Sequence, residues 1–159
     1  MTPRMPTPSR WQIPASPYLD ASALAKIYLP ETDSEELNSS LRGRRDIRVS
    51  ELSVTEVVSA IARRRREGAL SAEKAARLHR ALLADLSAGL FEEVLRLDPR
   101  THREAERLLL SSSIPLRALD ALHLALARSG AALCIVTFDV RLADAGRQIG
   151  LPAIPETLR

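Results

Sequence analysis

Aromatic residues make up only 3% of this 159-residue sequence, although apolar residues account for 45% of it. The core must therefore be built from Leu, Ala, Val and Ile, and few rings remain to stack on bases. This scarcity argues against RNA-recognition motifs and OB-type folds, because both bind bases on aromatic platforms. At this length we expect one domain with a sizeable core.

Cysteine occurs only once, as Cys134 within the apolar run 132–136. A single cysteine excludes an intramolecular disulfide and any multi-cysteine zinc site, and its apolar neighbours predict a buried side chain. The sequence also lacks an uninterrupted apolar run of about 20 residues and a signal-peptide core, so it predicts no membrane span. We therefore expect a cytoplasmic protein.

Lysine is confined to Lys26 and Lys74, so nearly all of the positive charge is arginine. The net charge of +3 is only mildly favourable for binding a polyanion. The densest group of arginines ends one predicted helix and consists of Arg63, Arg64, Arg65 and Arg66. This run is either a solvated helix end or a contact for an RNA backbone beside a functional site.

The chain divides into a leader, a domain and a short tail. Residues 1–17 contain five prolines and no periodicity, which predicts a flexible proline-rich leader. Within it, Trp11 is either a surface residue or a small docking contact. We expect the folded domain to span residues 18–155 and the C-terminal tail to span residues 156–159.

The domain alternates between short apolar segments and longer periodic ones. Helices are predicted over residues 22–28, 33–42, 53–67, 71–87, 100–112, 117–129 and 139–149. Strands are predicted over residues 18–20, 46–50, 91–97, 133–136 and 151–154. This alternation is typical of a parallel sheet covered on both faces, so we predict a three-layer α/β/α sandwich with a central, mostly parallel sheet of four to five short strands.

Four acidic residues fall where such a sheet gathers functional groups. Asp20 ends one predicted strand and Asp139 follows another, at the carboxyl ends where loops converge. Glu56 and Asp120 lie in the first turns of predicted helices. Crowded carboxylates repel one another, and a hard divalent cation such as Mg²⁺ or Mn²⁺ relieves that repulsion.

Each acid taken alone has another interpretation. Asp20 and Asp139 could simply cap the helices that follow them. Glu56 points away from the apolar stripe of its helix, which suits either a solvated surface or a cleft. Asp120 lies in a helix that is apolar nearly all round, so its charge needs a partner, either a functional site or a buried arginine.

These segments in this order resemble the PIN-domain ribonucleases, in particular the VapC toxins of toxin–antitoxin pairs. The matching motifs are Tyr18-Leu-Asp-Ala-Ser22, Val49-Ser-Glu-Leu-Ser-Val-Thr-Glu56, Leu116-Arg-Ala-Leu-Asp-Ala-Leu-His-Leu-Ala125 and Ile135-Val-Thr-Phe-Asp139. The resemblance extends over about residues 18–155. Each motif is modest by itself, but the ordered set is specific.

The resemblance implies a PIN-like fold and a metal-dependent endoribonuclease with Mg²⁺ or Mn²⁺ as cofactor. The acidic cluster of the family matches Asp20, Glu56, Asp120 and Asp139, which would be catalytic residues and metal ligands. Supporting roles fall to two hydroxyl neighbours and one further acid: Ser22, Thr137 and Asp144. For His123 we expect a core or cleft-wall position rather than a general base, since the metal can itself generate the nucleophile.

The resemblance also implies partners, namely an RNA substrate, a VapB-like antitoxin and a second copy of the chain in a homodimer. Two other functions remain open. A catalytically silent PIN-like module would only bind RNA or protein, but it has no use for all four acids. A phosphoacceptor domain would need a further strand-end Asp and a lysine late in the chain, whereas the last lysine is Lys74.

Overall fold

The structure, a computed structural model, describes residues 11–157. The strands are β1 (Pro17–Leu19), β2 (Arg48–Ser50), β3 (Glu93–Leu95), β4 (Cys134–Val136) and β5 (Ala153–Ile154). The helices are α1 (Ala21–Tyr28), α2 (Ser34–Leu41), α3 (Glu51–Arg66), α4 (Ala72–Ser87), α5 (Pro99–Ser111), α6 (Ala118–Ser129) and α7 (Val140–Gln148). Every helix and strand predicted from the sequence is present, with ends shifted by a few residues at most.

The five strands form one parallel sheet in the order β3-β2-β1-β4-β5. The chain builds outward from β1 to β2 and β3, then returns to β4 on the other side of β1 and continues to β5. The order therefore reverses between β1 and β4, and their loops diverge at the carboxyl edge. Ligands of open α/β sheets bind in the crevice at such a switch point.

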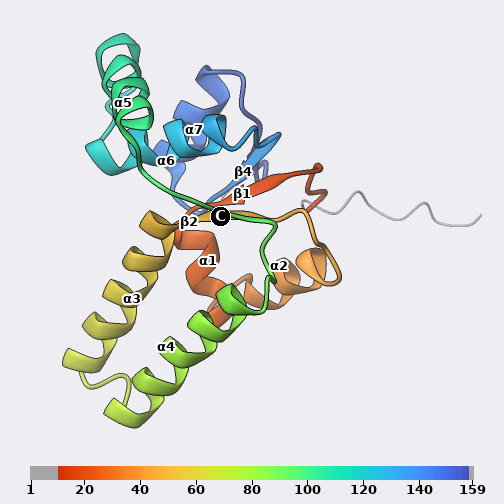
Figure 1. The fold of residues 1–159 in the computed structure, drawn as a ribbon, viewed down its shortest axis with the longest axis vertical. Coiled ribbons are helices and arrows are strands. Elements are labelled where there is room, and N and C mark those ends of the chain that lie inside the picture. Colours follow the sequence, from red (N-terminus) through yellow and green to blue (C-terminus); the bar gives the residue numbers. More distant parts are fainter. Residues whose placement is uncertain (1–10, 158–159) are drawn as a thin grey trace, which may run out of the picture.

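Helices cover both faces of the sheet, which confirms the three-layer α/β/α sandwich. In Figure 1, α1 to α4 lie on one side of the sheet and α5 to α7 on the other. Successive strand residues point to opposite faces: Leu19 and Val136 join the core beneath α1 to α4, whereas Tyr18 and Ile135 join the core beneath α5 to α7. Burial on both faces explains why β1, β4 and β5 carry no charged residue, whereas the less buried β2 and β3 carry Arg48 and Glu93.

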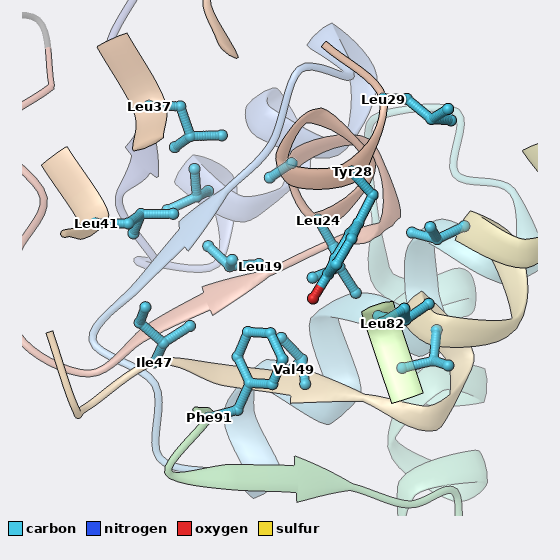
Figure 2. Close-up of a cluster of buried hydrophobic side chains, with 14 of the residues drawn as sticks. Leu19, Leu24, Tyr28, Leu29, Leu37, Leu41, Ile47, Val49, Leu82 and Phe91 are labelled. Atoms are coloured by element: carbon cyan, nitrogen blue, oxygen red, sulfur yellow. The ribbon is translucent and has the colours of Figure 1, made fainter. Parts of the chain in front are cut away.

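Leucines fill most of the larger core, as the shortage of aromatic residues requires. Figure 2 shows Leu19 of β1, Leu24 of α1, Leu37 of α2 and Leu82 of α4 pointing into the same cluster. All four side chains are fully buried. Burying one such side chain stabilises the fold by about 1.5–3 kcal/mol, so this cluster fixes α1, and with it the residues at its start, against the sheet.

The part of the predicted leader that the structure describes is packed against the domain. Trp11 is only 5% exposed, its indole contacts the Phe138 ring with centroids 5.6 Å apart, and its Nε1 donates to Glu36. Arg44 donates to the carbonyl oxygens of Ile13 and Pro14 at 2.8 and 2.7 Å. Trp11 is therefore a docking contact and not a surface residue. Residues 1–10 of the predicted flexible leader lie outside the described residues.

The structure also bears on the single cysteine and on the length and polarity of the helices. Cys134 is fully buried in β4, as its apolar neighbours predict. None of the helices within residues 11–157 combines the length and the apolar character that crossing a membrane requires.

Candidate active site

The four predicted acids meet in one cleft at the carboxyl edge of β1 and β4. The cleft has a volume of about 560 Å³, and its lining includes Asp20, Glu56, Asp120 and Asp139. Asp20 follows β1, Asp139 follows β4, Glu56 lies on α3 and Asp120 on α6. Residues up to 119 positions apart in the sequence are thus brought to the same cavity by the strand order.

Asp20 lies deepest, with 4% of its surface exposed. Its Oδ1 caps α1 by accepting the N–H of Ala23 at 2.9 Å, so the helix-cap interpretation is correct in part. Ser22 Oγ donates to both carboxylate oxygens, at 2.7 and 2.9 Å. Burial raises the pKa of Asp20 above its ordinary value, and the hydrogen bonds it accepts oppose that shift. A cation in the cleft would favour its charged form.

Thr137 joins the ends of the two central strands. Its Oγ1 donates to Asp20 Oδ2 at 2.6 Å and accepts the N–H of Asp139 at 3.0 Å. Asp139 caps α7, because its Oδ1 accepts the N–H groups of Arg141 and Leu142 at 2.9 and 3.1 Å. Only Oδ1 of Asp139 is used in this way, so the cap and a role in the cleft are compatible.

Glu56 faces the cleft from α3 with 29% of its side chain exposed. Its Oε2 lies 2.6 Å from His123 Nε2, and His123 Nδ1 lies 2.8 Å from the Tyr18 hydroxyl. His123 is 3% exposed and lines the cleft, which agrees with its expected position in the cleft wall. The interpretation of Glu56 as an ordinary solvated surface residue is therefore wrong.

Asp120 is 8% exposed and occupies the first turn of α6. Its Oδ2 accepts the backbone N–H of Arg117 at 3.1 Å, and within the described part of the chain no arginine or lysine side chain forms an ion pair with it. The structure therefore does not support the alternative of a buried pair with an arginine. Apart from one capping contact, the charge of Asp120 is directed to the cleft.

Basic side chains lie beside the acids. Four of them line the same cleft: Lys26, Arg63, Arg64 and Arg117. Lys26 is 8% exposed, and its Nζ lies 4.4 Å from the centroid of the Phe138 ring. Burial lowers the pKa of Lys26 below its ordinary value. Arg64 forms an ion pair with Glu31, another lining residue.

Four residues from the sequence prediction do not line the cleft, and one of them, Thr137, is fully buried and contacts Asp20. Arg65 and Arg66 are exposed on α3 outside the cleft, whereas Arg63 and Arg64 line it. Asp144 is exposed on α7 and pairs with Arg147 at 3.1 Å. Its position gives no support to a role as a further acid.

Sequence reasoning missed Tyr18, Lys26 and Arg117 as neighbours of the site. A signal existed for two of them. Lys26 is the one charged residue within the apolar helix α1 and lies one turn after Ser22, on the same face. Tyr18 carries the only hydroxyl in a strand buried throughout, and a buried tyrosine hydroxyl usually has a partner. Arg117 carried no comparable signal.

The donor set of the cleft fits a hard divalent cation. It offers four carboxylates and the Ser22 hydroxyl, all oxygen ligands of the kind Mg²⁺ and Mn²⁺ prefer. Over residues 11–157, no group of three or more His, Cys, Asp or Glu side chains converges closely enough to hold an ion by itself. An open site suits Mg²⁺, which usually keeps several waters and binds one or two carboxylates together with substrate phosphates.

The protein is an α/β domain with an acidic cleft at the switch point of an open parallel sheet. The PIN domain family matches residues 18–148, and the chain belongs to that family. Ribonuclease VapC46 of Mycobacterium tuberculosis is 35% identical over 142 residues, which cover 88% of this chain and 97% of VapC46. The chain is thus a VapC-type member of the PIN-domain ribonucleases, as its motifs predicted.

Solved structures share the fold at lower sequence identity. FitAcB from Neisseria gonorrhoeae superposes with a TM-score of 0.67 at 18% identity, covering 89% of this chain and 99% of the other. VapC20 of Mycobacterium tuberculosis, described as a toxin that cleaves the sarcin–ricin loop, has a TM-score of 0.64 at 15% identity, with 91% and 100% covered. PAE2754 from Pyrobaculum aerophilum has a TM-score of 0.63 at 22% identity, covering 87% of this chain and 83% of PAE2754. These likenesses confirm the PIN-like fold.

Proposed function

We propose that this chain is a Mg²⁺- or Mn²⁺-dependent endoribonuclease that acts as the toxin of a toxin–antitoxin pair. The observation that carries the proposal is the convergence of Asp20, Glu56, Asp120 and Asp139 on one cleft of a VapC-type PIN domain. A binding module without catalytic activity would have no use for four acids there, because like charges cost free energy unless a cation offsets them.

The chemistry follows from the charge of the substrate. An RNA phosphodiester resists attack because its oxygens are negative. A bound divalent cation would neutralise that charge and lower the pKa of a water toward neutrality. Carboxylates of this cluster, together with substrate phosphates and water, would hold the cation. Ser22 and Thr137 fix the Asp20 carboxylate at hydrogen-bonding distance. In-line attack of that water on the phosphorus would break the P–O3′ bond and leave a 5′-phosphate and a 3′-hydroxyl.

The basic side chains of the cleft hold the RNA backbone. Arg63 and Arg64 lie about two helical turns beyond Glu56 on α3 and line the same cleft, so an RNA strand that reaches the acids also passes them. Lys26 and Arg117 contribute positive charge from α1 and from the start of α6. This arrangement restricts the RNA contacts expected of the run 63–66 to its first two arginines.

The partner of the toxin is a small VapB-like antitoxin that blocks the acidic cleft, and a basic side chain placed among the carboxylates would do so most directly. A second copy of the chain forms a homodimer. Large apolar side chains that such partners could cover are exposed on several helices and loops, including Leu83, Leu109, Leu110, Leu119, Leu133 and Val140.

The proposal is tested with purified protein and total cellular RNA. We expect discrete cuts with Mg²⁺ or Mn²⁺ and none in EDTA, mapped by sequencing the new 5′ ends. An Asp20→Asn variant purified in the same way controls for contaminating nuclease. Undiminished cutting in EDTA, or equal cutting by the variant, would contradict the metal-dependent mechanism.

The toxin role is tested separately in cells. Expression of the chain alone should arrest growth, and co-expression of a small protein encoded beside it should restore growth. If expression of the active nuclease is harmless and a pull-down recovers no small neighbouring product, the toxin role is contradicted. The proposed ribonuclease activity is unaffected by that result.

A further inference from the structure

A buried series of hydrogen bonds runs behind the cleft from β1 to Glu56. The Tyr18 hydroxyl lies 2.8 Å from His123 Nδ1, and His123 Nε2 lies 2.6 Å from Glu56 Oε2. Tyr18 is fully buried and His123 is 3% exposed. The hydroxyl is held in turn by Ser50 Oγ at 2.8 Å and Ser53 Oγ at 3.3 Å. The imidazole therefore has a fixed contact at each nitrogen.

The direction of these hydrogen bonds follows from the groups at the two ends. A carboxylate can only accept a hydrogen bond. His123 Nε2 therefore carries a hydrogen and donates a hydrogen bond to Glu56. In the neutral imidazole Nδ1 is then the acceptor, and the Tyr18 hydroxyl is its donor.

We propose that His123, held by Tyr18, is a positioning residue that aims the second carboxylate oxygen of Glu56 into the cleft toward the divalent cation. This inference rests on the proposed function, in which Glu56 is a ligand. Glu56 needs such support because α3 carries it on a long side chain with 29% exposure, free to turn toward solvent. Its Oε1 accepts no hydrogen bond from any described residue, so the oxygen opposite the histidine is available to the cation.

The other acids reach the cleft in different ways, which explains why Glu56 alone has a histidine. Asp20, Asp120 and Asp139 are short side chains fixed by backbone N–H groups at the starts of helices. Glu56 lies in the second turn of α3, where the backbone N–H groups are already used within the helix. Its hydrogen bond comes from a side chain of another helix, His123 of α6.

The test compares two substitutions that differ in which neighbour they reach. His123→Gln places an amide N–H near the position of Nε2 and keeps a donor for Glu56, whereas His123→Asn is too short to reach it. The readout is Mn²⁺ affinity of EDTA-treated protein by titration calorimetry. We expect His123→Asn to lower the affinity about 10- to 100-fold, as loss of an outer-shell partner typically does. His123→Gln should restore most of it.

A double substitution separates positioning from general structure. In the Glu56→Gln background, His123→Asn should have no further effect on Mn²⁺ affinity, because the ligand it positions is already gone. Equal losses in His123→Asn and His123→Gln, or a full additional loss in the double variant, would overturn the proposal. If His123→Asn does not fold, Tyr18→Phe replaces it, since it keeps the ring and removes only the donor to Nδ1; unchanged affinity in that variant would also overturn it.

The proposed function fails in a different way. If Glu56→Gln leaves Mn²⁺ affinity unchanged while Asp20→Asn lowers it, the positioning role is overturned and the metal-dependent site stands. If neither substitution changes the affinity, the metal site itself is wrong.

Discussion

Thr137 Oγ1 donates a hydrogen bond to Asp20 Oδ2 at 2.6 Å across the boundary between β4 and β1. The same oxygen accepts the N–H of Asp139 at 3.0 Å, so one hydroxyl fixes two of the four acids relative to each other. The contact with Asp20 is buried, because Thr137 is fully covered and Asp20 nearly so, and the contact with Asp139 is partly buried. The spacing of the acidic cleft therefore depends on a residue without charge.

Replacing this hydroxyl should damage the site more than the fold. Thr137→Val keeps the shape, removes one of the two hydrogen bonds to Asp20 Oδ2 and leaves the Asp139 N–H without its Thr137 partner, which costs about 1–3 kcal/mol. We expect lower Mn²⁺ affinity and at least about a tenfold lower cleavage rate, since outer-shell partners carry effects of that size. Thr137→Ser is the matched control and should stay close to the unmodified protein in both assays. Full activity of Thr137→Val would contradict the role assigned to Thr137.

Asp120→Asn should separate catalysis from stability. Asn keeps an oxygen for the N–H of Arg117 and removes a charge that the neighbouring carboxylates repel, so the melting temperature in EDTA should hold or rise. RNA cleavage should fall at least about 100-fold, because one anionic ligand of the cation is lost. Thermal melts and cleavage assays on the same samples decide it. A variant that melts much earlier in EDTA yet still cuts RNA would show that Asp120 is structural.

Two arginines on one helix should differ in their contribution to RNA binding. Arg63 lines the cleft and Arg65 does not, although both are exposed. For single-stranded RNA each neutralised phosphate adds about 0.7 to the slope of log affinity against log salt concentration. Binding in EDTA, measured by fluorescence anisotropy over a salt series, should lose about that slope in Arg63→Ala. The slope should be unchanged in Arg65→Ala, and equal losses would place the RNA elsewhere on α3.

The stability of the chain should depend on pH through Asp46. The Arg44 guanidinium hydrogen-bonded to Asp46 lowers the pKa of that carboxyl to about 2, below the ordinary value of 3.8. Because the folded pKa is the lower one, the stabilisation is fully present above about pH 4 and is lost as the pH falls toward 2. Allowing for the 33% exposure of its side chain, we expect about 1 kcal/mol.

Urea unfolding in EDTA measures this contribution. Asp46→Asn should be less stable than the unmodified protein at pH 7, and the difference should shrink as the pH is lowered to 3. Asp144→Asn, which removes an exposed pair with Arg147, should change stability by less than about 0.5 kcal/mol at either pH. A difference for Asp46→Asn that grows in acid would refute the assigned sign.

The sequence allowed the fold to be predicted because local and global signals agree. Asp98 precedes Pro99 at the start of α5, and Gly68, with φ of 77°, follows α3 in a conformation that glycine adopts at little cost. Parallel strands buried on both faces read as short apolar runs. These signals do not predict the strand order, because it depends on how the helices pack on the two faces of the sheet.

Acids of the cleft could be predicted from the sequence because strand ends converge. The residues that hold these acids in place could not be predicted. Asp20 and Asp139 follow strands and could be placed from the sequence alone. The contact between Glu56 and His123 joins residues 67 positions apart on α3 and α6, and helical periodicity describes only one helix at a time. The division of the arginine run into cleft-lining and outward members likewise required the rotation of α3, which packing determines.

The contact between Trp11 and Phe138 bears on how shortened versions of the protein should be made. The family match begins at residue 18, and a version trimmed to that boundary would lose the indole that covers Phe138. Phe138 stands between Thr137 and Asp139 in the chain, and its backbone N–H donates to Ser22 at 2.8 Å. A cut chosen for convenience at the amino terminus would therefore loosen the loop that carries an acid of the cleft. Measurements of metal binding and cleavage belong on chains that retain Trp11.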